Sequence, residues 1–443
     1  MAGDLTITYD TTSSDTVSNA SGCGPATAIT GSNAISGDGA GGGTQTVIDL
    51  SGDTPDLSGV QVGDILLIVT SSASDRSLFE ITAVDDTADT VTVASAPTTA
   101  INTGSALAWA IGGKRPSLVN HNSRGDYWEF QPGWIAEMTA GQTFTTQASS
   151  TSYSSLNPSR TDVSPHHTVF RSSTEGTRYT IQTPSAGRYT WGRQSAFMVF
   201  DCHWDNQSNV ATTGQTTGFT WTRCKFSNSG TLSIALSPNI YINCLFDAWD
   251  PGSEDFFESS GIFPSYQFIS CRFDSCATVY FEIGQSARTA VHWFVDCEFF
   301  GTPSGAAVEI EALENNEKNS EDGGVTFLNC TFYDIAGDGI KINPGTKAEW
   351  DFPIVIRNCS FVNCGGYGVN FTTLGDDVPA YRLLIDYNHF HNNTSGDYSD
   401  TGLSPLNDIS GAPVFTSTTS GSEDFTPDTG SPLIDAAETP GTS

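Results

Sequence analysis

Short runs in which apolar and polar residues alternate recur along most of the chain. Examples are Phe197-Met-Val199, Val325-Thr-Phe327 and Ile354-Val-Ile356, and runs of a second kind follow glycine at Gly339-Ile-Lys-Ile342 and Gly368-Val-Asn-Phe371. Alternation with a period of two predicts β-strands with one buried face. Between these runs we find no helix-period segment. The pattern therefore predicts an all-β chain with about three short strands in each repeating unit.

A triplet of cysteine, any residue and an aromatic residue marks each repeat. The copies are Cys202-His-Trp204, Cys224-Lys-Phe226, Cys244-Leu-Phe246, Cys271-Arg-Phe273, Cys297-Glu-Phe299, Cys330-Thr-Phe332 and Cys359-Ser-Phe361, with Asn388-His-Phe390 as an eighth copy that lacks the cysteine. The spacing varies from 20 to 33 residues. A fixed apolar kernel with variable spacing predicts a solenoid whose coils differ in their loops. We expect the seven cysteines to form a ladder of buried free thiols, because cytosolic thiols are kept reduced.

The residue before the cysteine is often Asn or Asp, as at Asp201, Asn243 and Asn329. Asn and Asp tolerate left-handed backbone and bridge turns with their side chains. Stacked in a column, these residues are expected to mark the bend between two strands of each coil.

These features resemble the right-handed parallel β-helix repeat proteins, the pectate-lyase-like architecture. The resemblance covers residues 116–415 and implies coils stacked about 4.8 Å apart. The fold class expected is therefore all-β: a right-handed parallel β-helix preceded by a small N-terminal β-module and a flexible arm.

The segments outside the solenoid have their own patterns. Residues 1–45 are rich in Ser, Thr and Gly and predict the flexible N-terminal arm. Residues 46–115 alternate again and predict the small β-module. Residues 416–443 are expected to form a C-terminal cap or tail, because an open last coil would expose strand edges that template aggregation.

Charge excludes whole classes of partner. The 443-residue chain has 50 Asp plus Glu against 18 Lys plus Arg, a formal net charge of −32. Such a chain repels phosphate backbones and anionic membranes, so we expect no nucleic-acid partner. We also expect no membrane insertion and synthesis in a cytosol, because neither an 18-residue apolar run nor a signal peptide is visible.

Outward carboxylates on neighbouring coils are the candidate catalytic groups. Alternation places Glu282, Glu309 and Glu311 on the solvent side of their strands. Glu282 and Glu309 are expected to lie about 5 Å apart, near the separation of a retaining glycosidase pair. The alternative interpretation is a solvated polar ladder that continues to Lys341 and Asn370, because outward strand faces are expected to be polar.

One long coil combines aromatic and acidic residues and is the candidate carbohydrate-binding segment. Its residues are Trp249, Asp250, Glu254, Asp255 and Phe257. Rings stack on sugar faces, while carboxylates accept hydrogen bonds from hydroxyls. This loop and the acidic segment 314–322 would also suit Ca²⁺, although neither matches a known calcium motif; solvated loops are the plainer interpretation. No other cofactor and no metal site are expected, because His389 and His391 share a strand face without a third ligand nearby.

A β-module followed by a β-helix resembles the N-terminal region of bacteriophage virion proteins, including tailspike-like ones. The resemblance implies a structural virion protein, made in the host cytoplasm, that binds other virion proteins through its N-terminal region. A capsid decoration protein or head spike and a tailspike or fibre both fit. Such proteins are commonly homotrimers, and the rigid β-helix would stabilise the particle or attach it to a host surface glycan.

Two other classes remain open. A polysaccharide lyase or glycoside hydrolase on a β-helix scaffold would use the outward carboxylates. A cellular surface adhesin is less consistent with the missing signal peptide.

Overall fold

The computed structural model describes residues 6–13, 23–25, 27–32, 34–37, 46–69, 76–94, 105–106, 108–114, 135–145, 168–183, 197–206, 210–212, 219–227, 232–234, 239–248, 265–283, 291–312, 324–343, 353–372, 383–399 and 407–434. The chain divides into two compact units: Met1–Trp204 with Thr213–Thr217, and Asp205–Thr212 with Gly218–Ser443. Within the described ranges, no helix has the length and apolar character needed to cross a membrane.

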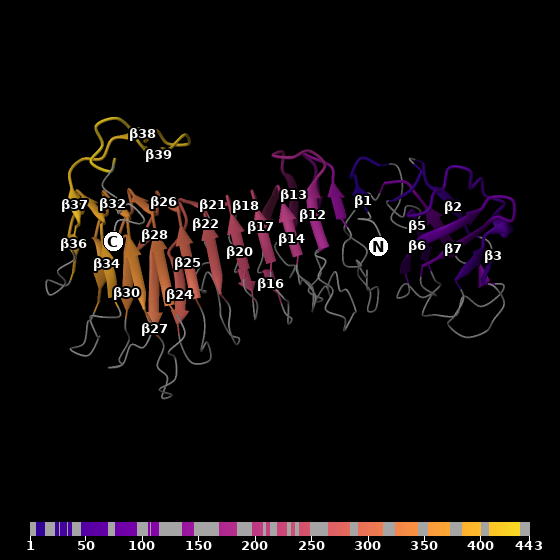
Figure 1. Cartoon of the computed structure of the whole chain (residues 1–443), viewed down its shortest axis with the longest axis horizontal. Coiled ribbons are helices and arrows are strands. Elements are labelled where there is room, and N and C mark those ends of the chain that lie inside the picture. Colours follow the sequence, from indigo (N-terminus) through magenta and orange to yellow (C-terminus); the bar gives the residue numbers. More distant parts are fainter. Residues whose placement is uncertain are drawn as a thin grey trace, which may run out of the picture. The chain divides into compact units, whose positions relative to one another are not determined.

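The second unit is a right-handed parallel β-helix built from three sheets (Figure 1). Its first sheet contains β17 (Phe219–Thr222), β20 (Asn239–Ile242), β22 (Tyr266–Ile269), β25 (Val291–Val295), β28 (Gly324–Leu328), β31 (Ile354–Arg357) and β34 (Leu383–Asp386). Its second sheet contains β18 (Lys225–Ser227), β21 (Leu245–Asp247), β23 (Arg272–Asp274), β26 (Glu298–Phe300), β29 (Thr331–Tyr333), β32 (Ser360–Val362), β35 (His389–His391) and β37 (Ile409–Ser410). Its third sheet contains β24 (Val279–Ile283), β27 (Val308–Ala312), β30 (Ile340–Asn343), β33 (Tyr367–Phe371) and β36 (Gly396–Tyr398), while β16 (Val210–Thr212) pairs with β19 (Leu232–Ile234).

Residues in the left-handed backbone conformation form the bend between the first two sheets. The residue before each kernel has a positive φ, at Arg223, Asn243, Ser270, Asp296, Asn329, Asn358 and Tyr387. The predicted turn column is confirmed. Arg223, Ser270 and Tyr387 also adopt it, so the stacking of the turn imposes this conformation even where the residue type does not favour it.

A second column of positive φ, which the sequence analysis did not predict, lies five residues further along. Its members are Ala248, Ser275, Gly301, Asp334, Asn363 and Asn392. Two left-handed bends thus enclose each three-residue strand of the second sheet, which explains why these strands are so short.

The aromatic residues of the triplets stack in the core. Phe226, Phe246, Phe273, Phe299, Phe332, Phe361 and Phe390 form one column with successive ring centroids 4.9, 4.7, 4.5, 4.7, 4.7 and 5.1 Å apart. A second column in the first sheet runs from Tyr241 through Phe268 and Phe294 to Phe327, with centroids 4.9, 4.8 and 4.8 Å apart. Edge-on contacts such as Tyr241 with Phe246 at 5.6 Å join the two columns. The core is therefore a continuous aromatic stack along the coils.

The predicted cysteine ladder is confirmed. Cys202, Cys224, Cys244, Cys271, Cys297, Cys330 and Cys359 are all buried free thiols. Each of four thiols lies within hydrogen-bonding distance of a carbonyl of the preceding coil, as Cys271 Sγ does at 3.3 Å from the Tyr241 oxygen and Cys330 Sγ at 3.4 Å from the Phe294 oxygen. In the eighth copy Asn388 takes the slot, donating to the Ile356 oxygen and accepting from the Cys359 amide, both at 3.0 Å. The slot thus requires a small side chain that can bond to the coil before it.

The first unit contains the beginning of the solenoid and an antiparallel module. In the solenoid part, β1 (Thr6–Tyr9), β10 (Ile135–Met138), β12 (Thr168–Ser172) and β14 (Phe197–Phe200) pair in parallel, as do β11 (Thr143–Thr145) and β13 (Tyr179–Thr183), while β15 (Cys202–Asn206) follows β14. The module contains β2 (Ile29–Gly31), β3 (Ala34–Gly37), β4 (Val47–Asp49), the 3₁₀ turn η1 (Ser51–Asp53), β5 (Ile65–Val69), β6 (Arg76–Asp85), β7 (Thr90–Val93), β8 (Ser105–Ala106) and β9 (Ala108–Ile111). Its order is β2-β9-β5-β6-β7-β4-β3-β8, around a core that includes Ile48, Ile68 and Trp109.

The expectation that residues 1–45 form a flexible arm is not met, because three strands of this segment belong to sheets. Ile7 and Tyr9 of β1 are fully buried in the first rung of the solenoid, and β2 and β3 belong to the module. Burial of these apolar side chains offsets the entropy cost of ordering the segment. The module is therefore an insertion between the first and second strands of the β-helix.

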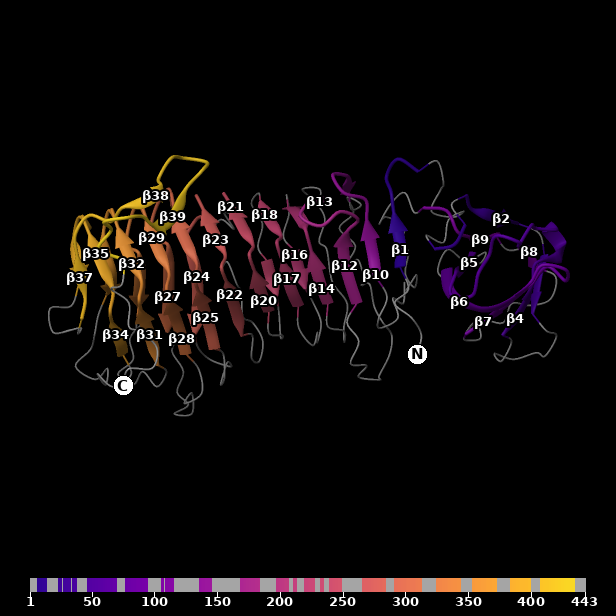
Figure 2. The same cartoon turned by 45° about the horizontal axis from the view of Figure 1, so that its top comes forward.

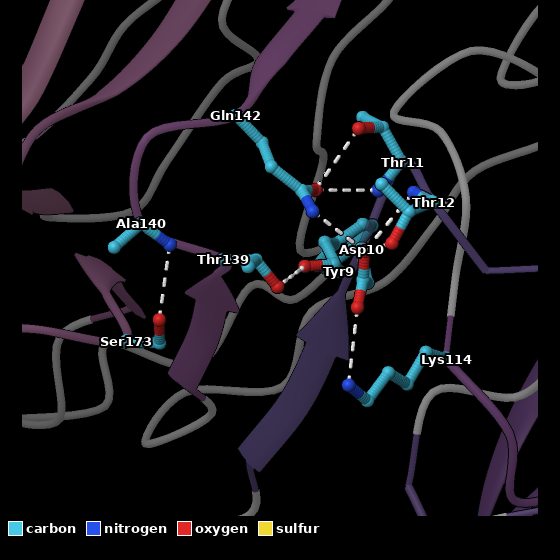
Figure 3. A network of polar contacts seen from close by, with 9 residues as sticks. All are labelled: Tyr9, Asp10, Thr11, Thr12, Lys114, Thr139, Ala140, Gln142 and Ser173. Carbon is cyan, nitrogen blue, oxygen red and sulfur yellow. Dashed lines mark hydrogen bonds and ion pairs between the residues drawn. The ribbon is translucent and has the colours of Figure 1, made fainter.

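A polar network joins the two ends of this insertion (Figure 3). Asp10 follows β1, and its Oδ1 accepts hydrogen bonds from Gln142 Nε2 and from Thr12 Oγ1, each at 2.7 Å. Its Oδ2 lies 3.0 Å from Nζ of Lys114, which follows β9. Burial by itself would raise the pKa of Asp10, but the bonds from Gln142, Thr12 and Lys114 outweigh it and hold this pKa well below its usual range.

Asp10→Asn is expected to destabilise the chain at neutral pH. Hydrogen bonds to a charged group contribute roughly 1.5–3 kcal/mol each, and the variant loses the charge in all of them. A depressed carboxyl pKa contributes stability that is present above the unfolded pKa of about 3.9 and is lost as the pH falls below it. Thermal unfolding should therefore give a lower Tm for Asp10→Asn than for the wild-type chain at pH 7, and this difference in Tm should be smaller at pH 3. Asp56→Asn, which removes an exposed carboxylate bonded to Ser58, is the control. An equal loss of stability in Asp10→Asn at both pH values would contradict the assignment.

Candidate functional site

The C-terminal segment forms a hairpin against the side of the β-helix (Figure 2). Its strands β38 (Phe415–Ser417) and β39 (Asp424–Pro427) are antiparallel. The buried ring of Phe425 lies 5.4 Å from that of Phe300 and 5.0 Å from that of Tyr333, both on the outward face of the second sheet. The segment was expected to cover the last coil, yet the hairpin packs over earlier coils. The reason is that Phe300 and Tyr333 point outward and need an apolar cover.

Arg272 completes the contact between the hairpin and the sheet. Its Nε lies 3.0 Å from Glu298 Oε2, its Nη2 lies 3.5 Å from Glu423 Oε2, and its Cζ is 4.9 Å from the centre of the Phe300 ring. One guanidinium thus neutralises a carboxylate from the sheet and another from the hairpin.

A groove of about 320 Å³ lies between the hairpin and the β-helix. Its floor is the outward column of the second sheet, with Glu298, Thr331, Ser360 and His389. One side is the left-handed turn column, with Asp296, Asn329, Asn358 and Tyr387, and the other contains Phe425, Thr426, Pro427 and Leu433. The rigid ladders therefore support one side of the groove, and the hairpin supplies the other.

The polar part of the groove includes the carboxylates of Asp296 and Glu298. Burial raises the pKa of Glu298. The charge of Arg272 lowers this pKa, whereas the carboxylates of Asp424 and Glu423 raise it further. Asp296 Oδ1 accepts a hydrogen bond from Asn329 Nδ2 at 3.0 Å. Asn358 Oδ1 is shielded from solvent and has no hydrogen-bond partner among the described residues.

Ser360 and His389 form a buried pair at the end of the groove floor. Ser360 Oγ lies 2.9 Å from His389 Nδ1, and His389 Nε2 lies 2.8 Å from the carbonyl oxygen of Gly411. A carbonyl can only accept, so Nε2 carries the proton and Nδ1 accepts from the serine. Burial lowers the pKa of His389, which keeps the ring neutral at neutral pH. Both ring nitrogens of His389 are thus occupied by protein groups, and among the described residues no group of His, Cys, Asp or Glu side chains is arranged to hold a metal ion.

The predicted catalytic carboxylates are not paired as expected. The register of β24 and β27 places Glu282 opposite Glu311 and Glu309 opposite Tyr280. The coils here are offset by 29 residues, not the 27 that the Glu282–Glu309 pair requires. Glu309 Oε1 lies 2.7 Å from Lys341 Nζ, and Lys341 is opposite Asn370. The column from Glu309 is thus an ion-paired polar ladder, while the side chains of Glu282 and Glu311 lie outside the described part of the structure.

The predicted carbohydrate-binding loop also falls outside the described residues. This applies to Trp249, Asp250, Glu254, Asp255 and Phe257, and to the acidic segment 314–322 with its expected Ca²⁺. Both remain predictions.

The groove residues were missed by the sequence reasoning, although a signal for its floor was present. The middle residue of each triplet points outward, so Lys225, Leu245, Arg272, Glu298, Thr331, Ser360 and His389 form one column of the second sheet. The last four of these are the groove floor. The hairpin above them depends on contacts between distant parts of the chain and has no local signature.

A family model supports the same fold. The model of the family described as "Right handed beta helix region" matches residues 315–407, and no curated protein matches the chain. Among solved structures, the chain is similar to the Gp54 tailspike of Acinetobacter baumannii bacteriophage AP22 in complex with capsular saccharide, at 10% identity and a TM-score of 0.29, over 81% of this chain and 66% of the tailspike. It is also similar to a PL6 family polysaccharide lyase from Pseudopedobacter saltans, at 11% identity and a TM-score of 0.28, over 63% of this chain and 87% of the lyase. The tailspike gp61 of Pseudomonas phage phi297 matches at 14% identity and a TM-score of 0.24, over 93% of this chain and 70% of the tailspike.

The family match lies within the coils of the second unit, where the three sheets, the thiol ladder and the aromatic columns were described. The chain therefore contains a right-handed parallel β-helix, as the spacing of its triplets predicted.

Proposed function

We propose that this chain is a structural protein of a bacteriophage virion whose β-helix presents the groove to a glycan of the host surface. It would be made in the host cytoplasm and attach to other virion proteins through the inserted module. Both a capsid decoration protein or head spike and a tailspike or fibre fit this role. The observation that carries the proposal is the groove beside the hairpin, because its chemistry matches that of a sugar.

Sugar hydroxyls are hydrogen-bond donors, and the groove offers acceptors. The carboxylates of Asp296 and Glu298 line this space. Tyr387 adds ring surface for the apolar face of a sugar. The acceptors on the turn column stand on stacked coils and so are held in place before a ligand arrives, which reduces the ordering cost of binding.

Binding of purified host surface polysaccharide tests the glycan part of the proposal. Thr331→Arg places a bulky side chain on the groove floor and is expected to weaken binding at least tenfold in isothermal titration. Asp296→Ala removes a carboxylate acceptor from the groove lining and should weaken binding by roughly 5- to 30-fold, corresponding to about 1–2 kcal/mol. Asn370→Arg adds the same group as Thr331→Arg to the outward face of the third sheet and is the control. Unchanged binding in Thr331→Arg would refute the groove as the site.

The location in the particle requires a separate test. Peptide mass spectrometry of purified particles should detect this chain. Antibodies against the hairpin are expected to label intact particles, whereas antibodies against the module should bind only dissociated ones. Absence of the chain from purified particles would overturn the virion assignment, whatever the glycan results.

A polysaccharide lyase or glycoside hydrolase is the second candidate function. It is favoured by Glu298, a carboxyl with a raised pKa in the same groove as Asp296, since a raised pKa suits a general acid. The assay is release of reducing ends or of unsaturated sugars from a bound host glycan. Release that is lost in Glu298→Gln and kept in Glu309→Gln would establish the enzyme activity. A glycan that binds without being cleaved would exclude this activity on that glycan.

A further inference from the structure

The floor of the groove ends in a serine and a histidine that lie side by side on neighbouring coils. Ser360 is the middle residue of its triplet and His389 is that of the next, so register places both on the outward face of the second sheet, opposite each other. Both side chains are almost fully buried, at 4% and 1% exposure, and both line the groove. The pair is therefore shielded from bulk water but adjoins a space that a ligand can fill.

The hydrogen bonds of this pair determine where its protons lie. His389 Nε2 is 2.8 Å from the carbonyl oxygen of Gly411, so Nε2 carries the ring proton. Nδ1 therefore accepts the hydroxyl proton of Ser360, whose Oγ is 2.9 Å away. A hydroxyl bonded to an imidazole that a third group orients is the arrangement of an activated serine nucleophile. Here the carbonyl of Gly411 orients the ring and would stabilise the imidazolium that forms during reaction.

We propose that Ser360 and His389 are the nucleophile and the general base of an esterase activity that removes acyl groups from sugar hydroxyls. Neither glycan binding by the groove nor acid catalysis by Glu298 uses this pair. The sugar as the carrier of the ester rests on the proposed function, whereas the ester chemistry of the pair does not.

The surroundings of the pair suit a short acyl group. Ile409 follows His389 in the same outward column, and Leu433 of the C-terminal segment lines the same groove, so both offer apolar contact to an acyl chain. Thr331 is opposite Ser360 in the preceding coil, and its hydroxyl can donate a hydrogen bond to the oxyanion. The groove volume of about 320 Å³ is at the lower end of the range for small-molecule sites, which favours a small acyl group.

The reaction needs only water as a second reactant. Ser360 Oγ attacks the carbonyl carbon of the ester while its proton passes to His389 Nδ1. The imidazolium then gives this proton to the sugar oxygen as the bond between carbonyl carbon and sugar oxygen breaks, which leaves the acyl group on Ser360. A water molecule, deprotonated by Nδ1, cleaves the new ester, and the proton returns to Ser360 Oγ as the carboxylic acid leaves.

Hydrolysis of 4-nitrophenyl acetate by the full chain tests the chemistry, and acetate release from an O-acetylated host polysaccharide tests the substrate class. The wild-type chain is expected to turn over both esters. Ser360→Ala and His389→Gln should each lower kcat/KM by about 100-fold or more. A fluorophosphonate should also label the wild-type chain, and peptide mass spectrometry should place the adduct on Ser360, a result that does not depend on how well a variant folds.

Ser399→Ala is the matched control, because it also removes a partly buried serine hydroxyl. Ser399 Oγ donates to the carbonyl oxygen of Phe371 at 3.0 Å, on the third sheet. This variant should keep the wild-type rate on 4-nitrophenyl acetate and the adduct on Ser360. Circular dichroism should show a native fold in every variant compared.

The pH dependence of the rate separates a catalytic histidine from a structural one. Burial lowers the pKa of His389, the bond to the Gly411 carbonyl raises it, His391 lowers it and Asp397 raises it, with a net decrease. The carboxylates of Asp296 and Glu298 are the other charged groups that line the groove. Because the base must be neutral, the rate should reach half its maximum below the ordinary histidine pKa of about 6.5 and stay constant from about pH 7 to 9.

Three results would overturn the esterase assignment. They are no turnover of either ester by the wild-type chain, turnover that a folded Ser360→Ala variant retains, and a rate that rises about tenfold per pH unit above pH 7, which is attack by hydroxide. A polysaccharide that binds in the groove but keeps its acetyl groups would refute the sugar ester as substrate and leave the proposed function intact. Hydrolysis of 4-nitrophenyl acetate without any binding of the polysaccharide would refute the proposed function and support the chemistry of the pair.

Discussion

Replacing Phe299 with alanine is expected to lower the free energy of unfolding by roughly 3–5 kcal/mol. The buried ring is stacked 4.5 Å from Phe273 and 4.7 Å from Phe332, and lies 5.7 Å from Phe294 of the other column. Each coil contacts only its neighbours, so the cavity would also weaken the coupling between the coils on its two sides. Urea unfolding should show the loss, together with a broader or divided transition.

Phe299→Leu is the control for this prediction, since it keeps most of the apolar volume in the column. Its cost should be well under half that of the alanine variant. A loss below about 1 kcal/mol for Phe299→Ala would mean that the aromatic stack is not a main source of stability.

Phe425→Ala is expected to release the hairpin while the β-helix stays folded. Phe425 contacts Phe300, Tyr333 and Phe415, at ring distances of 5.4, 5.0 and 5.4 Å. A loss of about 3 kcal/mol would raise the open population of the hairpin roughly 100-fold. Limited proteolysis and hydrogen exchange of residues 411–434 should report it, and glycan binding should weaken because one side of the groove is lost.

Val414→Ala serves as the comparison, because Val414 is 42% exposed and belongs to the same segment. It should leave the proteolysis rate within about twofold of wild type, since surface substitutions of this kind change stability by less than about 0.5 kcal/mol. Equal rates for Phe425→Ala and the wild-type chain would contradict the packing of the hairpin.

The interior of the β-helix could be predicted from sequence because each coil repeats the same local requirements. Cys330 and Phe332 recur at fixed positions relative to a left-handed Asn329, and each requirement is met within a few residues. The second bend was missed because Ala248 and Ser275 interrupt the Gly, Asp and Asn residues that mark it in the later coils. Stacking on neighbouring coils imposes that conformation, and stacking is not visible in a single coil.

Contacts between residues far apart in the sequence account for the other differences between the predictions and the structure. Four residues of alternation in β1 are too short a signal to predict pairing with β10, and the segment was expected to be an arm. The hairpin site depends on Phe300 and Tyr333, whose outward direction follows from the strand pattern but whose partner does not. The Glu282–Glu309 pairing failed because the offset between two coils is fixed by loop length, which the alternating pattern does not determine.

The position of β1 has a consequence for synthesis on the ribosome. Thr6 pairs with Ile135, so the first strand leaves the exit tunnel long before its partner exists. At roughly 5–20 residues per second the delay is on the order of 6–25 s. The inserted module emerges in that interval, and its folding would bring the two ends of its segment together and shorten the loop that β1 must close. The order of translation thus lets the insertion assist the first rung of the solenoid.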